Sequence, residues 1–95
     1  MSITRVNQFK AASGKEEKLF DFLQSLTSYI TNSDGCISYE VLRDIEDQST
    51  FLIIEKWESI NAHKNSVNSF PKEEMQSAMS LFGGPPSGKY YSGSG

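Results

Sequence analysis

The chain has 95 residues, of which 37% are hydrophobic and 22% charged, so it is long enough for one small globular domain and too apolar to be disordered. Its formal net charge of −3 creates no field that attracts phosphate backbones, which disfavours a nucleic-acid partner. The single cysteine excludes an internal disulfide, and we find no apolar leader and no stretch that suits a membrane. We therefore expect a cytoplasmic protein without a membrane partner.

Signatures of metal and nucleotide binding are weak. The only histidine, His63, and the only cysteine, Cys36, are far apart in sequence, whereas a zinc site usually collects four such ligands. Residues 83–86, Gly-Gly-Pro-Pro, indicate a turn rather than a loop that cradles phosphates. The sequence therefore predicts no metal site and no bound cofactor.

The first third of the chain predicts a strand and then a helix. Residues 3–10 carry three apolar side chains that suit a strand, although they do not alternate cleanly. An amphipathic pattern of the i, i+3, i+4, i+7 type predicts a helix over residues 15–31. Ser13 is the expected N-cap of this helix, with Glu16 as its capping-box partner.

A hairpin of two strands is expected next. The strand over residues 36–43 places four side chains on one face, namely Ile37, Tyr39, Val41 and Arg43. The polar residues 44–49 form the loop, and residues 50–54 then read Thr-Phe-Leu-Ile-Ile. Such an unbroken apolar run favours a central strand that is covered on both faces.

The last third predicts a helical region in two pieces and a final strand. Ser59 is the expected N-cap of a short helix, whose shared face carries Ile60, His63 and Val67. Residues 65–69 are interpreted as a break.

Pro71 suits the first position of the second piece, where its missing N–H is not needed. The apolar stripe of that helix is formed by Met75, Ala78, Met79 and Phe82. A short strand around residues 89–91 follows, and residues 93–95 are expected to form a loose tail behind a single domain over 1–92.

The predicted order is β-α-β-β-α-β, which is the ferredoxin-like α+β arrangement with an antiparallel sheet and helices on one face. Helices on one face leave the other face of an apolar sheet uncovered. A second copy of the same sheet is the simplest cover, so we expect a two-fold homodimer.

Three local motifs resemble the antibiotic biosynthesis monooxygenase domain, a family of dimeric α/β barrels. Residues 13–17 (Ser-Gly-Lys-Glu-Glu) are similar to the family's entry to its first helix. Residues 34–41 (Asp-Gly-Cys-Ile-Ser-Tyr-Glu-Val) resemble its second strand, and residues 55–59 (Glu-Lys-Trp-Glu-Ser), leading to His63, resemble its tryptophan-bearing strand end. Together the motifs span most of the chain, from about residue 9 to residue 67. Members include cofactor-free oxygenases of phenols and quinols, haem-degrading enzymes and a sugar-phosphate isomerase.

Three residues are the candidates for catalysis. Trp57, at the end of the central strand, would form one wall of an aromatic-substrate pocket, or else simply fill the core or a dimer interface. His63 is the candidate base because imidazole titrates near neutral pH, although a histidine on an apolar helix face is more often structural. Asn7, on the same strand face as Arg5, could orient a substrate oxygen or satisfy a strand edge.

Four further residues are candidates for substrate binding. Tyr39 and Arg43 share a strand face and could hold a phenolate or carboxylate, whereas an arginine near a strand end is more often solvated. Met75 and Met79 fit a core stripe, and their flexible side chains also suit an adaptable pocket lid.

The resemblance implies a cofactor-independent monooxygenase that acts on an electron-rich aromatic substrate, with no metal and no cofactor. The first alternative is a haem-binding or haem-degrading module. It is disfavoured because relatives often place the helix histidine about a turn later, near Ser66 or Val67. The second alternative is a non-catalytic dimer that binds a small ligand.

Overall fold

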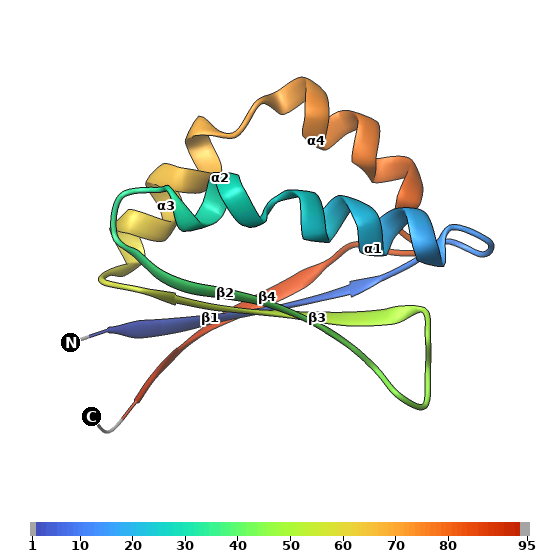
Figure 1. The fold of residues 1–95 in the computed structure, drawn as a ribbon, viewed down its shortest axis with the longest axis horizontal. Coiled ribbons are helices and arrows are strands. Elements are labelled where there is room, and N and C mark those ends of the chain that lie inside the picture. Colours follow the sequence, from blue (N-terminus) through green and yellow to red (C-terminus); the bar gives the residue numbers. More distant parts are fainter. Residues whose placement is uncertain (1, 94–95) are drawn as a thin grey trace.

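The computed structural model describes residues 2–93, which form a four-stranded sheet with helices packed on one face (Figure 1). The elements in chain order are β1 (Ile3–Lys10), α1 (Glu16–Ser25), α2 (Thr27–Thr31), β2 (Cys36–Arg43), β3 (Thr50–Trp57), α3 (Ile60–Ser69), α4 (Lys72–Ala78), the 3₁₀ helix η1 (Met79–Leu81) and β4 (Ser87–Ser92). This order confirms the predicted ferredoxin-like α+β fold.

The ends of the described chain lie on the same side of the molecule, because Ile3 at the start of β1 pairs with Ser92 at the end of β4 (Figure 1). Of the predicted tail, Ser94 and Gly95 lie outside the described residues. None of the helices within residues 2–93 combines the length and hydropathy that a membrane crossing requires.

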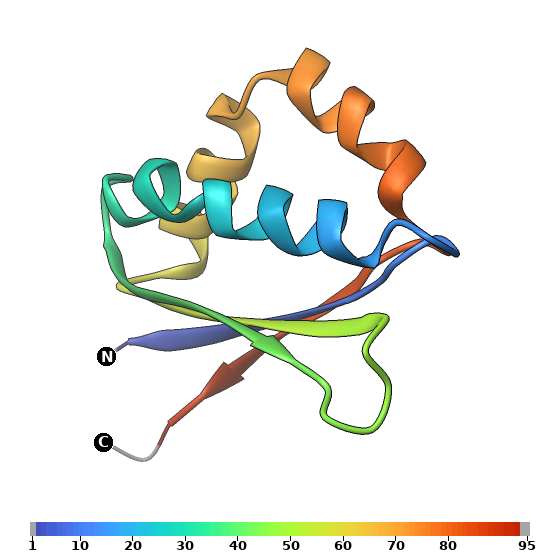
Figure 2. The same cartoon turned by 45° about the vertical axis from the view of Figure 1, so that its right-hand side comes forward.

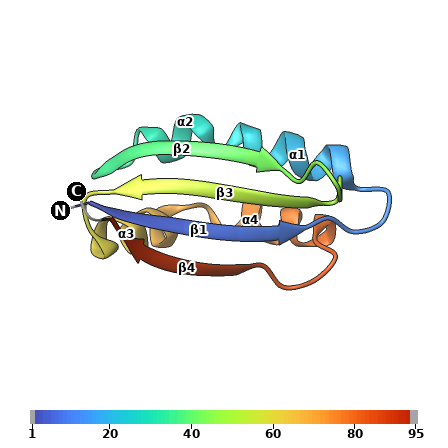
Figure 3. The ribbon, with the colours of Figure 1, turned by 90° about the horizontal axis from the view of Figure 1, so that it is seen from below.

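The sheet has the strand order β2-β3-β1-β4, and each neighbouring pair is antiparallel (Figure 3). The apolar strand β3 lies between β2 and β1, as its sequence predicted. Arg5 pairs with Glu55 and Asn7 with Ile53 across β1 and β3. Paired residues share a face of the sheet, so Arg5, Asn7 and Glu55 all point toward the helices together with the buried Trp57.

The core fills the space between α1 and the strands β2 and β3. Leu19 and Leu23 of α1 are fully buried against Phe51 and Ile53 of β3. The alternation in β3 explains this, because every second residue from Phe51 to Trp57 is buried. Burying a side chain of this size stabilises the fold by about 1.5 to 3 kcal/mol.

No helix covers the opposite face of the sheet (Figure 3), and this face carries several apolar side chains. Leu42 of β2 pairs with Leu52 of β3, and Ile54 of β3 pairs with Val6 of β1. Leu42 is 42% exposed, and Tyr91 on β4 is 52% exposed. Apolar side chains are therefore present on this face, beside the charged Glu40 and Lys56, whereas the two-fold partner stays a prediction.

The predicted helix over residues 15–31 is wrong as one continuous helix, because the chain breaks it at Leu26. The amide of Leu26 donates to the carbonyl of Leu23, three residues back, at 3.3 Å. The hydroxyls of Ser25 and Thr27 donate to nearby backbone carbonyls at 2.6 and 2.7 Å. Hydroxyls that bond locally to the backbone compete with regular helix geometry, and two of them flank the break.

The predicted N-cap at Ser13 is also wrong. Helix α1 begins at Glu16, and the residue in the cap position, Lys15, makes no side-chain hydrogen bond. Instead, Gly14 adopts a φ of 77° and the amide of Lys15 donates to the carbonyl of Ala12 at 2.9 Å. A tight backbone turn built on a glycine therefore takes the place of the side-chain cap.

The predicted start of α3 is confirmed, whereas its predicted end is wrong. Ser59 caps α3 as predicted, and its hydroxyl accepts from the amide of Ala62 at 3.1 Å. The break predicted over residues 65–69 is wrong, because α3 continues to Ser69. Ser66 is buried there, since its carbonyl accepts from the Tyr29 hydroxyl at 2.6 Å. Pro71 stands one position before α4, as its N-cap.

Strand β2 contains a register shift that moves one predicted residue. The pairing with β3 slips between Cys36 and Ser38, which leaves Ile37 54% exposed. Ile37 therefore does not share the inner face with Tyr39, and the alternation predicted for this strand holds only beyond the irregularity.

Candidate functional site

A cavity of about 490 Å³ lies between the sheet and the helices on the side of β1 and β4. In Figure 3, α1 and α2 lie over the β2 side, while α3 and α4 lie over the β1 and β4 side. Helix α4 also lies farther from the sheet than α1 (Figure 2). Most of the walls are apolar and include Phe9, Leu26, Ile30, Phe70, Met75 and Phe82. The polar part of the lining includes Arg5, Asn7, Glu55, His63, Lys64 and Tyr90.

Glu55 lies at the centre of the polar lining and is only 5% exposed. One carboxylate oxygen, Oε1, accepts a hydrogen bond from the Trp57 indole Nε1 at 2.8 Å. The other, Oε2, lies 3.5 Å from the Asn7 amide Nδ2, which donates to it. The strand explains the first contact, because residues two apart in β3 point to the same face. Trp57 and Asn7 thus fix the orientation of the carboxyl group.

His63 links this carboxyl group to Tyr90. The imidazole is 7% exposed, and its Nδ1 lies 2.7 Å from the Tyr90 hydroxyl. Its Nε2 lies 3.7 Å from Glu55 Oε1, and its ring meets the Trp57 ring edge-on at a centroid distance of 5.6 Å. Ser59 positions the histidine, because the cap sets the start of α3 one turn before it. The three side chains form a continuous line from β3 through α3 to β4.

The environment shifts the protonation of both groups toward their neutral forms. Burial raises the pKa of Glu55 above its ordinary value, and the hydrogen bond from Trp57 and the charge of Arg5 offset part of that rise. Burial, followed by the charges of Arg5 and Lys64, lowers the pKa of His63 to about 4. His63 is therefore neutral at neutral pH, so its 3.7 Å contact with Glu55 is not an ion pair there. A neutral buried imidazole is able to accept a proton.

Arg5 lies beside this line and contacts two of its members. Its Nε donates to Asn7 Oδ1 at 2.8 Å, and its guanidinium carbon lies 4.5 Å from the centre of the Tyr90 ring. Gly88, opposite Asn7 on β4, makes this arrangement possible. A Cβ atom at Gly88 would overlap with atoms of both Arg5 and Asn7. Any larger residue there would push both side chains out of place.

Four of the predicted site residues meet at this cavity: Asn7, Trp57, His63 and Met75 all line it. Asn7 contacts Arg5 and Glu55 with its amide, so both ends of that amide are already bonded. Met79 does not line the cavity and is 60% exposed. It follows the last turn of α4, at the start of the 3₁₀ helix η1.

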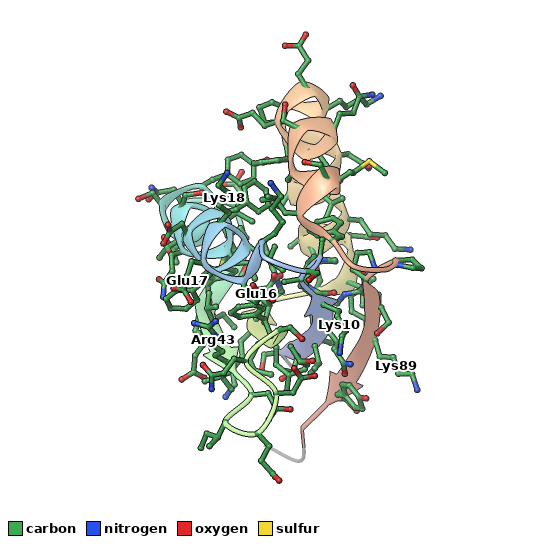
Figure 4. All side chains as sticks on the ribbon, turned by 90° about the vertical axis from the view of Figure 1, so that its right-hand side faces the viewer. Lys10, Glu16, Glu17, Lys18, Arg43 and Lys89 are labelled. Atoms are coloured by element: carbon green, nitrogen blue, oxygen red, sulfur yellow. The ribbon has the colours of Figure 1, made fainter. Side chains whose placement is uncertain are left out.

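Tyr39 and Arg43 also lie outside the cavity, under α1. The Tyr39 hydroxyl donates to the carbonyl of Leu23 at 2.6 Å, and its burial raises its pKa. Arg43 Nη1 is 2.8 Å from a carboxylate oxygen of Glu17, and Figure 4 shows the two side chains together on the α1 side. Its Nε donates to the carbonyl of Gln48 at 2.8 Å. These groups are occupied by the fold itself.

Three lining residues were missed as site candidates: Arg5, Glu55 and Tyr90. For two of them, the alternation of side chains along a strand was enough to predict their place. Glu55 is two residues before Trp57, and Arg5 is two residues before Asn7, so each shares a face with a candidate. Tyr90 had no such signal, because its place opposite Arg5 depends on the pairing of β4 with β1.

The donor groups fit neither a metal ion nor haem. Within residues 2–93, no three side chains of the histidine, cysteine, aspartate and glutamate types come together as metal ligands would. An axial ligand of haem iron needs a histidine nitrogen turned toward open space. Both nitrogens of His63 face protein groups, Tyr90 on one side and Glu55 on the other.

Solved structures share this fold closely at low sequence identity. A candidate antibiotic biosynthesis monooxygenase from Nitrosomonas europaea has a TM-score of 0.89 and 12% identity, with 98% of this chain and 90% of that chain covered. PA3566 from Pseudomonas aeruginosa has a TM-score of 0.85 and 22% identity, with 96% and 93% covered. Rv0793 from Mycobacterium tuberculosis has a TM-score of 0.86 and 15% identity, with 98% and 95% covered.

No curated protein matches the chain as a relative. The sequence itself does match the model of one protein family, described as antibiotic biosynthesis monooxygenase, over residues 2–80. That match includes β1 to β3, the helices α1 to α4 and the residues Glu55, Trp57 and His63. Because it spans most of the sequence, the chain belongs to the antibiotic biosynthesis monooxygenase family.

Proposed function

We propose that this chain is a monooxygenase that oxidises an electron-rich aromatic substrate, a phenol or a quinol, in the cavity beside Glu55 and His63. The observation that carries the proposal is the line of contacts from Glu55 through His63 to Tyr90 at the wall of a largely apolar cavity. Family membership supports a monooxygenase. The aromatic walls support an aromatic substrate, because rings attract one another through edge and face contacts.

The proton leaves the substrate hydroxyl through Tyr90. In the tautomer with its proton on Nε2, His63 accepts a hydrogen bond from the Tyr90 hydroxyl at Nδ1, across 2.7 Å. The Nε2–H then points toward Glu55 Oε1, 3.7 Å away. As Tyr90 takes the substrate proton, it passes its own to His63, and the carboxyl group of Glu55 stabilises the imidazolium that forms. Trp57 and Asn7 hold Glu55 in the position that this step requires.

Molecular oxygen is the oxidant, and the substrate supplies all the electrons. The deprotonated ring transfers one electron to O₂, and the resulting radical pair combines to form a carbon–oxygen bond. The oxygen–oxygen bond then breaks, and water leaves with the second oxygen atom. For hydroquinone, the sum is hydroquinone plus O₂ giving hydroxybenzoquinone plus water, which balances in atoms and electrons without a further reductant. The buried ring of Trp57 helps to keep bulk water away from these intermediates.

The test is oxygen consumption by the purified protein with a panel of quinols, under air and under nitrogen. We expect product only with oxygen, and a kcat that falls by roughly 100-fold or more in His63→Gln. Asn61→Ala is the matched control, because Asn61 is an exposed residue of the same helix that does not line the cavity. Equal product with and without oxygen would contradict the oxygenase. Equal turnover rates for wild type and His63→Gln would contradict the role of His63. Ligand binding without any turnover by wild type would instead favour a non-catalytic ligand-binding protein.

The partner of this chain is a second copy of itself, bound through the uncovered face of the sheet. The support is the apolar set of Val6, Leu42, Leu52 and Ile54 on that face. A charge placed at Leu52, whose cross-strand neighbours Gln8 and Leu42 are uncharged, would have no partner and would oppose association. We expect wild type to sediment as a dimer and Leu52→Lys as a monomer, with Ile45→Lys, in the exposed loop between β2 and β3, as the control. A wild type that sediments as a folded monomer would exclude this interface.

A further inference from the structure

The cavity has an electrostatic character opposite to that of the whole chain. The chain has a formal net charge of −3. The cavity lining, however, contains two cations, Arg5 and Lys64, and a single carboxyl group, Glu55. Glu55 is also tied to Trp57 and Asn7 by hydrogen bonds, so its lone pairs are already partly used. The remaining field inside the cavity favours an anion.

Arg5 lines this space and has unused hydrogen-bonding capacity. Its Nε is bonded to Asn7, and Tyr90 supports the guanidinium plane from one side. Within residues 2–93, no carboxylate lies within ion-pair distance of Arg5, and its two terminal nitrogens donate no hydrogen bond. A guanidinium presents a rigid fork of donors that matches the two oxygens of a carboxylate. Arg5 is therefore a cation that makes no close ion pair among the described residues, and the neighbouring Glu55 interacts with it only at longer range.

Arg43 provides a comparison, because it is an arginine of the same sheet whose guanidinium is paired with a carboxylate of the protein. It lies on the same face, two strands away, and also contacts aromatic rings, those of Phe20 and Phe51. Its Nη1 meets the Glu17 carboxylate at 2.8 Å, and its Nε meets the Gln48 carbonyl (Figure 4). Arg5 has the matching aromatic support and the bond at Nε, but lacks the carboxylate. A bound ligand that carries an anionic oxygen group would fill this position.

We propose that Arg5 binds an anionic oxygen group on the aromatic ligand, so that the cavity selects aromatic anions over neutral aromatics of the same shape. The anion is a ring carboxylate or a phenolate, since both present oxygen to the guanidinium. Lys64, at the exposed rim, adds to the attraction without orienting the ligand. This inference deepens the proposed function and uses the same cavity. It concerns binding, however, and requires no turnover.

The test compares pairs of ligands that differ in charge but little in shape, by calorimetric titration without oxygen. The first pair is 2,5-dihydroxybenzoate and its methyl ester, which reports on a ring carboxylate. The second is 4-nitrophenol in its ionised and neutral forms, set by pH, which reports on a phenolate. Wild type should bind the anion of at least one pair about ten-fold or more tightly than the neutral partner. Equal affinities within both pairs would overturn the inference without any variant.

Variants then assign the preference to one side chain. Arg5→Gln should abolish the preference for the anion, Arg5→Lys should keep part of it, and Arg43→Gln should leave it unchanged. A preference that persists in a folded Arg5→Gln, judged by circular dichroism, would also overturn the inference. Because titration is done without oxygen, the two proposals fail separately. An anion that binds but is never oxidised contradicts the monooxygenase alone, and turnover of neutral quinols without charge preference contradicts the role of Arg5 alone.

Discussion

The space between the sheet and the helices has two halves, which share one sheet face but differ in how completely side chains fill them. The closed half, under α1, is filled by Leu19, Leu23, Phe51 and Ile53. The open half, under α3 and α4, is the cavity lined by Arg5, Glu55 and Tyr90. Each half has an arginine and a tyrosine that point toward the helices. In the closed half both are bonded to the fold, and in the open half both face the cavity. The neighbours, not the residue types, decide which polar groups remain available for chemistry.

The largest expected effect comes from the same substitution made in each half. Leu23→Ala removes a fully buried side chain from the closed half and should lower the free energy of unfolding by about 3 to 5 kcal/mol. Leu26→Ala, in the half-buried lining of the cavity, should lower it by about 1 kcal/mol or less, because open space already adjoins it. Urea denaturation measures both. Equal losses would mean that the two halves are packed alike.

The next effect separates activity from stability within the open half. Glu55→Gln keeps an oxygen that can accept from Trp57, but it removes the charge that stabilises protonated His63. We expect kcat to fall by about ten- to 100-fold with little change in KM. Burial raises the pKa of Glu55 in the folded chain above its ordinary value of 4.5. Ionisation of Glu55 therefore lowers the stability of the folded chain as pH rises past 4.5. The variant should therefore be no less stable than wild type at neutral pH, and a large loss of stability would show that Glu55 is structural.

A smaller effect is visible in the titration of the only histidine. Proton NMR should give His63 a pKa of about 4, and Arg5→Gln should move that value up toward 6.5 by removing a nearby cation. Between pH 6.5 and 4 the unfolded chain takes up a proton that the folded chain does not, so His63 contributes a loss of stability as pH falls through this window. The difference in unfolding free energy between wild type and His63→Gln reports this contribution. A titration near 6.5 in wild type would contradict the buried, cation-facing site.

The smallest effect distinguishes the two methionines. Met75 lines the cavity and Met79 is 60% exposed outside it. We expect Met75→Ala to raise KM a few-fold and Met79→Ala to leave both KM and stability within error. Steady-state kinetics and denaturation settle the comparison, and a larger effect from Met79 would place the ligand elsewhere.

The sequence predicts the fold better than it predicts the site, and the reason is physical. Apolar alternation and the cap at Ser59 report local geometry, so the order of strands and helices follows from them. The pairing of His63 with Tyr90 depends on β4 returning beside β1, a long-range contact that no local pattern encodes. The contact that holds Arg43 outside the cavity was hidden for a similar reason, because its partner Glu17 lies on a helix that only the folded chain brings near. The contact between residues two positions apart on one strand, such as Glu55 and Trp57, is predictable from the sequence.

The measurement that tests the central claim most directly is turnover of a quinol under isotopically labelled oxygen gas, with mass spectrometry of the product. The proton relay through Tyr90 and His63 and the oxidation by O₂ predict one labelled oxygen atom in the hydroxyquinone formed by wild type. They also predict a loss of that product in His63→Gln. Product that carries no label, or labelled product formed as fast by His63→Gln as by wild type, would contradict the account.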